Sequence, residues 1–315
     1  MTSIVTFYRF VAIDDPERLR EHIDEIARTR GVVGTVLLAH EGINATLAHP
    51  QRRPLEETLA TLRKDSRLGD IIARWSRGAD GNPVFHRLKV RVRPEIVTLD
   101  GPLEATAPRG THVDADTWNR LLEDPQVTVI DTRNDYEIES GTFPGARAPG
   151  IRHFRDFPEF VADLSPVDHP RVAMFCTGGI RCEKAGALMT AKGFEVYQLD
   201  GGILRYLETV GRDENAWQGE CFVFDQRVTL TADLQQGDYV QCHACRRPVS
   251  EAGRQSPDYR PGVSCPKCAN ETSTVQRSRY AERARQEARA RARGGRHVGA
   301  RQEGLRDVDV NEVSS

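Results

Sequence analysis

The feature that most constrains the fold of this chain is a cysteine between a strand pattern and a helix pattern. The apolar run 171–175 is typical of a buried strand, and Ala185, Leu188 and Met189 follow at helical spacing. Between them the sequence reads Cys-Thr-Gly-Gly-Ile-Arg over residues 176–181. The two glycines let the backbone curl so that several N–H groups point inward. This pattern predicts an α/β domain with an anion-binding loop.

Cys176 is the candidate catalytic residue of this loop. The partial positive charge of a helix N-terminus and the full charge of Arg181 both favour a thiolate, which is the nucleophilic form of cysteine. A small buried cysteine at a strand end is the alternative explanation, and the Gly-Gly-x-Arg surroundings favour the reactive one. We therefore expect an active-site loop made of Thr177, Gly178, Gly179, Ile180 and Arg181.

Cys182 follows the loop directly and has two possible roles. It could form a disulfide with an oxidised Cys176, or it could pack in the first helical turn. We favour packing, because helix geometry is expected to direct its side chain away from the loop interior.

The loop length distinguishes two enzyme classes. Six residues from Cys176 to Arg181 is the length seen in rhodanese-type sulfur-handling domains. Tyrosine and dual-specificity phosphatases resemble this arrangement but use a loop one residue longer, which would require Arg where Cys182 stands. Upstream, the segment Asp131-Thr132-Arg133, followed by Glu137, resembles the first half of a rhodanese domain. In that family such residues tie the sheet to the loop, so Asp131, Arg133 and Glu137 are expected to be structural clamps rather than acid–base catalysts.

Length and composition place few limits on partners. The 315 residues are enough for two or three domains, and a net charge of −2 implies no particular partner. Residues 1–10 are too short an apolar stretch for a signal peptide or a membrane span. Seven cysteines, four of them in CxxC pairs, suit metal and thiol chemistry in a reducing cytoplasm better than a disulfide framework. We expect a cytoplasmic protein without a membrane segment.

The N-terminal part predicts a ferredoxin-like α+β sandwich. Strand patterns at 4–12, 32–39, 43–48 and within 85–97, with helices at 16–30 and 54–62, follow the order β-α-β-β-α-β. Glu41, Gly42 and Asn44 fit a hairpin turn, and presentation of polar groups to a substrate is the alternative. Lys89, Arg91 and Arg93 share one strand face. Phosphate binding and a merely solvated face explain that row equally well.

The rest of the chain predicts two further regions. Alternating strands and helices over 112–212 indicate a parallel α/β sheet. Cys242, Cys245, Cys265 and Cys268 form two CxxC pairs with nineteen residues between them, which is the spacing of a closed structural zinc site. His243 is expected to be a bystander. The predicted boundaries are 1–98 for the ferredoxin-like domain, 99–111 for a linker, 112–214 for the rhodanese domain, 215–275 for the zinc-binding region and 276–315 for a basic helix with a disordered tail. The basic composition of that helix suits RNA contact.

Together these segments resemble the rhodanese-domain tRNA uridine(34) hydroxylases. The resemblance rests on residues 34–44, 89–91, 95–97, 131–134, 176–185 and 217–228 and on the paired CxxC motifs. It implies oxygen-dependent hydroxylation at C5 of the wobble uridine to 5-hydroxyuridine, with tRNA as partner, oxygen as co-substrate and Cys176 in the active site. His40 departs from the family, in which an acidic residue is common at that position.

Two alternatives to the hydroxylase remain from the residues. A sulfurtransferase would carry a persulfide on Cys176 to tRNA or another acceptor, and a non-catalytic RNA-binding protein would use the N-terminal domain and the basic tail. For the hydroxylase, attack of the thiolate on C6 of uracil would make C5 nucleophilic. The sequence has neither a Gly-rich dinucleotide fingerprint after a strand nor a His-rich facial triad, so no flavin, nucleotide or iron site is expected.

Overall fold

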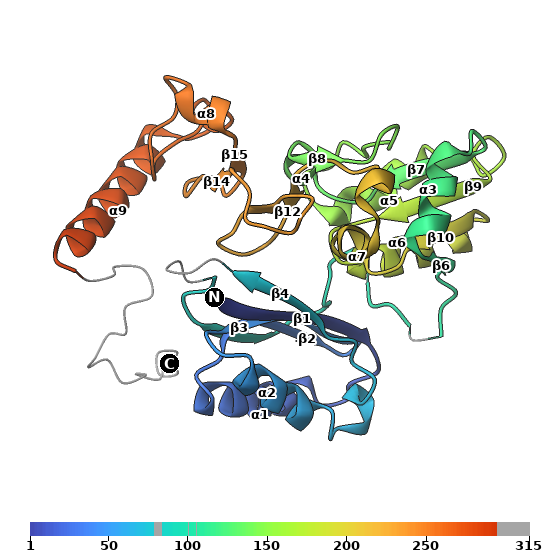
Figure 1. Cartoon of the computed structure of the whole chain (residues 1–315), viewed down its shortest axis with the longest axis horizontal. Helices are drawn as coiled ribbons and strands as arrows, with labels where there is room; N and C mark the ends of the chain where they lie inside the picture. Colours follow the sequence, from blue (N-terminus) through green and yellow to red (C-terminus); the bar gives the residue numbers. More distant parts are fainter. Residues whose placement is uncertain (79–83, 100, 105, 295–315) are drawn as a thin grey trace, which may run out of the picture. The chain divides into compact units, whose positions relative to one another are not determined.

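The computed structural model describes residues 1–78, 84–99, 101–104 and 106–294 of the chain (Figure 1). The chain divides into two compact units. The first consists of Met1–Gln241 and Arg246–Arg254, and the second of Cys242–Cys245 and the residues from Gln255 onward. No helix within the described part is both long and apolar enough to cross a bilayer. The disordered tail expected after the basic helix falls at 295–315, outside the described residues.

The N-terminal domain has the predicted β-α-β-β-α-β order, with one additional strand. Its five-stranded sheet has the order β4-β1-β3-β2-β5, and α1 and α2 pack on one face of it. The elements are β1 (Thr2–Phe10), α1 (Pro16–Thr29), β2 (Val33–Ala39), β3 (Gly42–His49), α2 (Arg53–Leu62), β4 (Arg74–Gly78) and β5 (Leu88–Val92).

One strand assignment from the sequence is corrected. The strand expected within 85–97 exists as β5, but it is a fifth strand, parallel to β2 at one edge. The strand that completes the ferredoxin-like unit is β4, antiparallel to β1 at the other edge. Its sequence, Arg-Trp-Ser-Arg-Gly, has no β-branched residue and little apolar character, so periodicity does not reveal it.

The predicted parallel α/β domain is built on a four-stranded sheet of order β6-β10-β9-β7. All three strand pairs are parallel, and β9 is one of the two central strands, so its carboxyl end lies in the middle of the sheet edge. The elements are β6 (Thr111–Val113), α3 (Ala115–Glu123), β7 (Val127–Asp131), α4 (Asp135–Ile138), β8 (Gly141–Thr142), α5 (Phe157–Ala162), β9 (Arg171–Phe175), α6 (Ile180–Ala191), β10 (Glu195–Leu199) and α7 (Gly202–Thr209).

Part of the region that the sequence assigned to the zinc site belongs structurally to this α/β domain. Trp217 and Cys221 lie in the same core cluster as Phe143 and Phe175. The ring of Phe143 is 5.1 Å from that of Trp217 in an edge-on arrangement. The strands involved are β11 (Gln218–Gly219), paired with β8, and β12 (Cys221–Phe222), paired with β13 (Thr229–Leu230).

The remaining elements lead into the second unit. Strands β14 (Val240–Gln241) and β15 (Pro248–Val249) pair antiparallel, and α8 (Glu251–Gln255) follows. The predicted basic helix is present as α9 (Thr274–Ala292), where Arg283 donates a 2.6 Å hydrogen bond to the carbonyl of His243. This contact holds the helix against the first CxxC turn.

Candidate active site and metal site

Cys176 follows β9 directly and is fully buried. Gly179 adopts a left-handed backbone conformation with φ of 97°, and its N–H donates a 3.1 Å hydrogen bond to the Cys176 sulfur. Only glycine adopts this conformation readily, which explains the second glycine of the Gly-Gly pair. The inward-pointing N–H groups predicted from the sequence are therefore present.

The surroundings of Cys176 stabilise a thiolate. Burial opposes ionisation, but a hydrogen bond from Cys182, the charge of Arg181 and the backbone N–H groups of Arg181 and Cys182 together lower the pKa of Cys176 to about 5. The sulfur is therefore ionised at neutral pH. A buried anion held by several N–H donors is suited to nucleophilic attack or to carrying a transferred group.

Arg181 pairs with Glu137, a residue expected from the sequence to be a structural clamp, although this particular pairing was not predicted. Its guanidinium forms two hydrogen bonds with the Glu137 carboxylate, of 2.6 and 2.8 Å, and both side chains are buried. The same Glu137 caps α4 by accepting from the Asn134 N–H. The Arg181 charge thus acts on Cys176 from a fixed position, because the bidentate ion pair holds it in place.

Cys182 packs in the first turn of the helix, as favoured from the sequence, but its side chain lies next to Cys176 instead of pointing away from the loop. Its side chain is buried, but it hydrogen-bonds to the Cys176 sulfur and lies 3.6 Å from the hydroxyl oxygen of Thr132. Burial and the neighbouring Cys176 anion raise the pKa of Cys182 well above its ordinary value, so it stays a thiol and donates to the anion. The helix begins at Ile180, so Cys182 is in its first turn, next to the loop.

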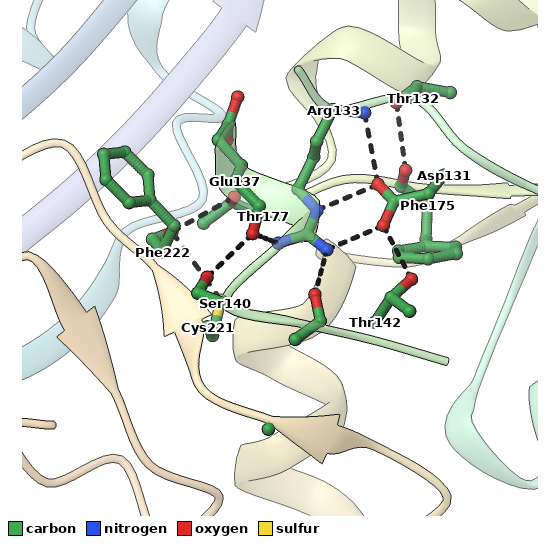
Figure 2. A network of polar contacts seen from close by, with 12 residues as sticks. Asp131, Thr132, Arg133, Glu137, Ser140, Thr142, Phe175, Thr177, Cys221 and Phe222 are labelled. Carbon is green, nitrogen blue, oxygen red and sulfur yellow. Dashed lines mark hydrogen bonds and ion pairs between the residues drawn. The ribbon is translucent and has the colours of Figure 1, made fainter. Parts of the chain in front are cut away.

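Asp131 and Arg133, which the sequence predicts to support the loop, form a buried ion pair with each other (Figure 2). Arg133 donates to both carboxylate oxygens of Asp131, at 2.9 and 2.6 Å, and to the carbonyl of Gly141 at 2.6 Å. The Thr142 hydroxyl donates to the same carboxylate at 2.9 Å, and all these groups are largely buried. The pair joins the end of β7 to β8. Because neither side chain has a hydrogen bond to Cys176, we assign them a structural role.

The loop is also held from the next strand–helix turn and from β12. The N–H groups of Ile203 and Leu204 donate to the carbonyls of Cys176 and Thr177, at 3.0 and 3.1 Å. A Cβ at Gly202 would lie 2.3 Å from the Cys176 carbonyl oxygen, so the close approach requires glycine there. The Thr177 hydroxyl donates to the carbonyl of Phe222 at 3.4 Å (Figure 2).

Tyr8 of β1 contacts the cysteine loop from the N-terminal domain, and the sequence analysis missed it. Its hydroxyl donates to Glu183 at 3.2 Å, and a Cβ at Gly179 would lie only 2.9 Å from that oxygen. Burial and the negative charges of Glu183 and Cys176 raise its pKa, so the phenol stays protonated. His112 also bonds Glu183, at 3.1 Å. Nothing in the local sequence distinguishes Tyr8 from the other aromatic residues of β1.

A buried lysine links the helix after the loop to the N-terminal domain. Lys184 pairs with Glu41 at 2.8 Å and with Glu95, and it donates to the carbonyl of Gly101 at 2.9 Å. Glu41 in addition accepts from the N–H groups of Ile96 and Leu103, at 2.8 and 2.6 Å. The predicted hairpin is present, but its turn lies at His40 and Glu41, and Gly42 and Asn44 belong to β3. Glu41 tethers the segment that connects the two domains.

The four predicted zinc ligands are brought together in the second unit. The sulfur atoms of Cys242, Cys245, Cys265 and Cys268 lie within 4.8 Å of one another. The sulfur atoms of Cys242 and Cys268 lie 3.8 Å apart, and the sulfur of Cys265 lies 3.7 Å from those of both Cys245 and Cys268. A tetrahedron of sulfurs about 2.3 Å from zinc has edges of about 3.8 Å. The donor set and its geometry therefore fit a structural zinc ion, and His243 is not in the group.

Comparison with known proteins identifies two domains. Residues 2–96 match the family model described as the UPF0176 acylphosphatase-like domain, and residues 114–209 match the rhodanese-like domain. This combination is the UPF0176 architecture. The rhodanese-like domain supports a sulfurtransferase-like or related activity that depends on a reactive cysteine.

Solved structures resemble single parts of the chain. A rhodanese-related protein from Thermoplasma volcanium is 21% identical over 31% of this chain and 91% of its own, with a TM-score of 0.27. An acylphosphatase from Bacillus subtilis is 19% identical over 29% of this chain and 99% of its own, with a TM-score of 0.24. A Saccharomyces cerevisiae homologue of single-domain rhodanese and the Cdc25 phosphatase catalytic domain is 17% identical over 37% and 91%, with a TM-score of 0.29.

Proposed function

We propose that this protein hydroxylates C5 of the wobble uridine, position 34, of tRNA in an oxygen-dependent reaction that uses the Cys176 thiolate. The observation that carries the proposal is a buried cysteine whose sulfur accepts a loop N–H, in a loop that a second domain contacts through Tyr8. A thiolate at this position is suited to attack an electron-poor pyrimidine ring, and the second domain offers further surface for a large substrate. The resemblance of several segments of the sequence to the tRNA uridine hydroxylases supports the same reaction.

The chemistry balances with dioxygen and a thiol reductant. The Cys176 thiolate forms a bond to C6 of uracil, and the electron pair of the C5–C6 double bond moves to C5. One oxygen atom of dioxygen then bonds to C5. The other leaves as water, with two electrons and two protons from two thiols that become a disulfide. Loss of the C5 proton and departure of the thiolate restore the ring as 5-hydroxyuridine.

The loop residues have separate tasks in this scheme. The N–H groups that hold the Cys176 sulfur keep it ionised before attack and receive the thiolate again when it leaves C6. The Arg181–Glu137 pair keeps the positive charge at a constant position through both steps. Cys182 stays a thiol and donates a hydrogen bond to the Cys176 thiolate before the substrate binds.

The decisive experiment is mass spectrometry of nucleosides from tRNA incubated with the full-length protein, dithiothreitol and isotopically labelled dioxygen. We expect uridine-34 to gain one labelled oxygen atom. Cys176→Ser should abolish the product. Cys221→Ala is the matched control, because it removes another fully buried cysteine that has no hydrogen bond to Cys176, and it should retain the product. Unchanged hydroxylation by Cys176→Ser would refute the proposal.

A sulfurtransferase is the second candidate, and the anion-binding loop from Cys176 to Arg181 favours it. A persulfide on Cys176 would carry a negative charge on its terminal sulfur. The loop N–H groups that point inward would stabilise that charge. With thiosulfate as donor, the thiolate takes the outer sulfur and sulfite leaves. Intact-mass measurement distinguishes the two candidates. One added sulfur on Cys176, passed on to tRNA in place of an oxygen gain, favours the transferase.

A further inference from the structure

The N-terminal sheet has a polar face on the side opposite α1 and α2. Side chains alternate between the two faces of a strand, and Val5, Phe7, Val36 and Leu38 point into the core with the helices. Their neighbours point the other way. Part of that side is covered, because Ile4 and Ala48 form a buried apolar cluster with Val84. We give the name open face to the polar remainder, which consists of Thr6, Tyr8, Thr35, Leu37, Asn44, Thr46, Arg74, Lys89 and Arg91.

The strand registers place these residues in two rows across the sheet. Arg74, Thr6, Thr46, Thr35 and Lys89 are successive partners on β4, β1, β3, β2 and β5. The hydroxyl oxygens of Thr6 and Thr46 lie 3.2 Å apart. The second row consists of Tyr8, Asn44, Leu37 and Arg91. Apart from Lys89 and Arg91, which are exposed, the members of both rows are half-buried.

One end of both rows lies at the cysteine loop. Tyr8 contacts Gly179, as described above. Arg74 lies 3.7 Å from the Asp200 carboxylate, and a Cβ at Gly201 would clash with its guanidinium. The turn at 200–203 is the one that holds the Cys176 carbonyl. The open face is therefore continuous with the loop that carries the reactive sulfur.

The other end of both rows is strongly cationic. Arg87, Lys89, Arg91 and Arg93 are all exposed and recur with period two along the β5 segment. Among the described residues, no carboxylate forms a salt bridge with any of the four. Partial burial and the charges of Arg87, Arg91 and Arg246 lower the pKa of Lys89. Cations that repel one another without a carboxylate partner are suited to a polyanion.

We propose that the open face binds the single-stranded segment of the RNA substrate through its phosphates and leads it to Cys176. The inference rests on the proposed function, which makes RNA the substrate. Tyr8 and Arg91 are three strand spacings apart, or about 14 Å, so the face is long enough to contact a short single-stranded segment. Tyr8 and its same-face neighbour Phe10 are aromatic, but cations and threonine hydroxyls outnumber them, so backbone contacts dominate over base stacking.

The test is binding of an unmodified tRNA transcript to the full-length protein by fluorescence anisotropy over a range of salt concentrations. The variant that tests the open face, which we call the platform variant, is Lys89→Ala with Arg91→Ala. The matched control is Arg18→Ala with Lys64→Ala, which removes two exposed cations, one from α1 and one just after α2, on the helix-covered side. Since exposed side chains are replaced, folding should be unaffected. A second platform variant, Arg87→Ala with Arg93→Ala, repeats the test at independent positions.

We expect each platform variant to weaken binding several-fold and to reduce the slope of log K against log salt by about 0.7 for each cation removed. The control should match wild type. If wild type binds tRNA and both platform variants bind it equally well, the open face is not the docking surface, although the proposed function stands. If wild type does not bind tRNA at all, both the inference and the proposed function fail.

Discussion

The molecule contains two groups of cysteines that differ in what surrounds the sulfur. In the α/β domain, Cys176 is held by backbone N–H groups, by a second thiol and by a charge fixed through Glu137. In the second unit, four sulfurs lie within 4.8 Å of one another, and three of the separations between them are 3.7–3.8 Å. The first arrangement stabilises one anion by hydrogen bonds. The second concentrates sulfur donors that only a cation can hold together.

The two sites differ in how many contacts between distant parts of the chain they require. The CxxC turns bring two sulfurs together within four residues, so the metal site needs only one long-range contact between its two halves. The thiolate site depends on contacts from distant parts of the chain, including Glu137 and Tyr8. We therefore expect the two sites to respond independently to mutation.

The largest effect should follow removal of a zinc ligand. Structural zinc binding is worth about 10–16 kcal/mol at neutral pH in small domains, so Cys268→Ser should release the metal and unfold the second unit. Metal analysis and hydrogen exchange of residues 242–245 and 255–268 measure this. Cys176→Ser is the matched substitution and should keep one zinc ion per chain. Zinc loss in Cys176→Ser would contradict the independence of the two sites.

A smaller effect should follow removal of the carboxylate that holds Arg181. Glu137→Gln leaves a buried guanidinium without its counter-charge, which costs about 3–5 kcal/mol in comparable buried pairs. Urea unfolding of the full-length protein measures this loss. Glu139→Gln, an exposed position just after the same short helix, is the control and should change the free energy of unfolding by less than about 0.5 kcal/mol. Equal stability of both variants would show that the pair is not important for the fold.

The smallest effect concerns the ionisation of Cys176. Its pKa of about 5 means that the sulfur is a thiolate at neutral pH and becomes protonated as the pH falls through 5. The thiolate ultraviolet absorbance of wild type minus that of Cys176→Ser should follow this titration. Cys182→Ala removes the thiol donor and should raise the midpoint by about one pH unit, because a hydrogen bond to a charged group is worth about 1.5–3 kcal/mol. A wild-type midpoint near 8.5 would show that the loop does not stabilise the anion.

The contiguous features of the sequence predicted much of the fold and of both sites. Helix and strand periodicity placed most elements of the N-terminal and α/β domains within a few residues, because side-chain alternation is a local property. The short β4 was missed, since Arg74 and Ser76 carry no strand signal and the strand depends on pairing with β1. The direction of Cys182 was also missed, because helix geometry alone does not show what lies next to its first turn.

The loop from Cys176 to Arg181 and the two CxxC turns could be predicted from the sequence, because each consists of a few consecutive residues. The partners of those residues depended on folding. Glu137 reaches Arg181 across 44 positions, and Tyr8 reaches Glu183 across 175. No local pattern records such contacts, because they arise from the packing of whole strands and helices. The candidate catalytic cysteine could therefore be predicted from the sequence, whereas the charges and the second domain that surround it could be identified only in the folded structure.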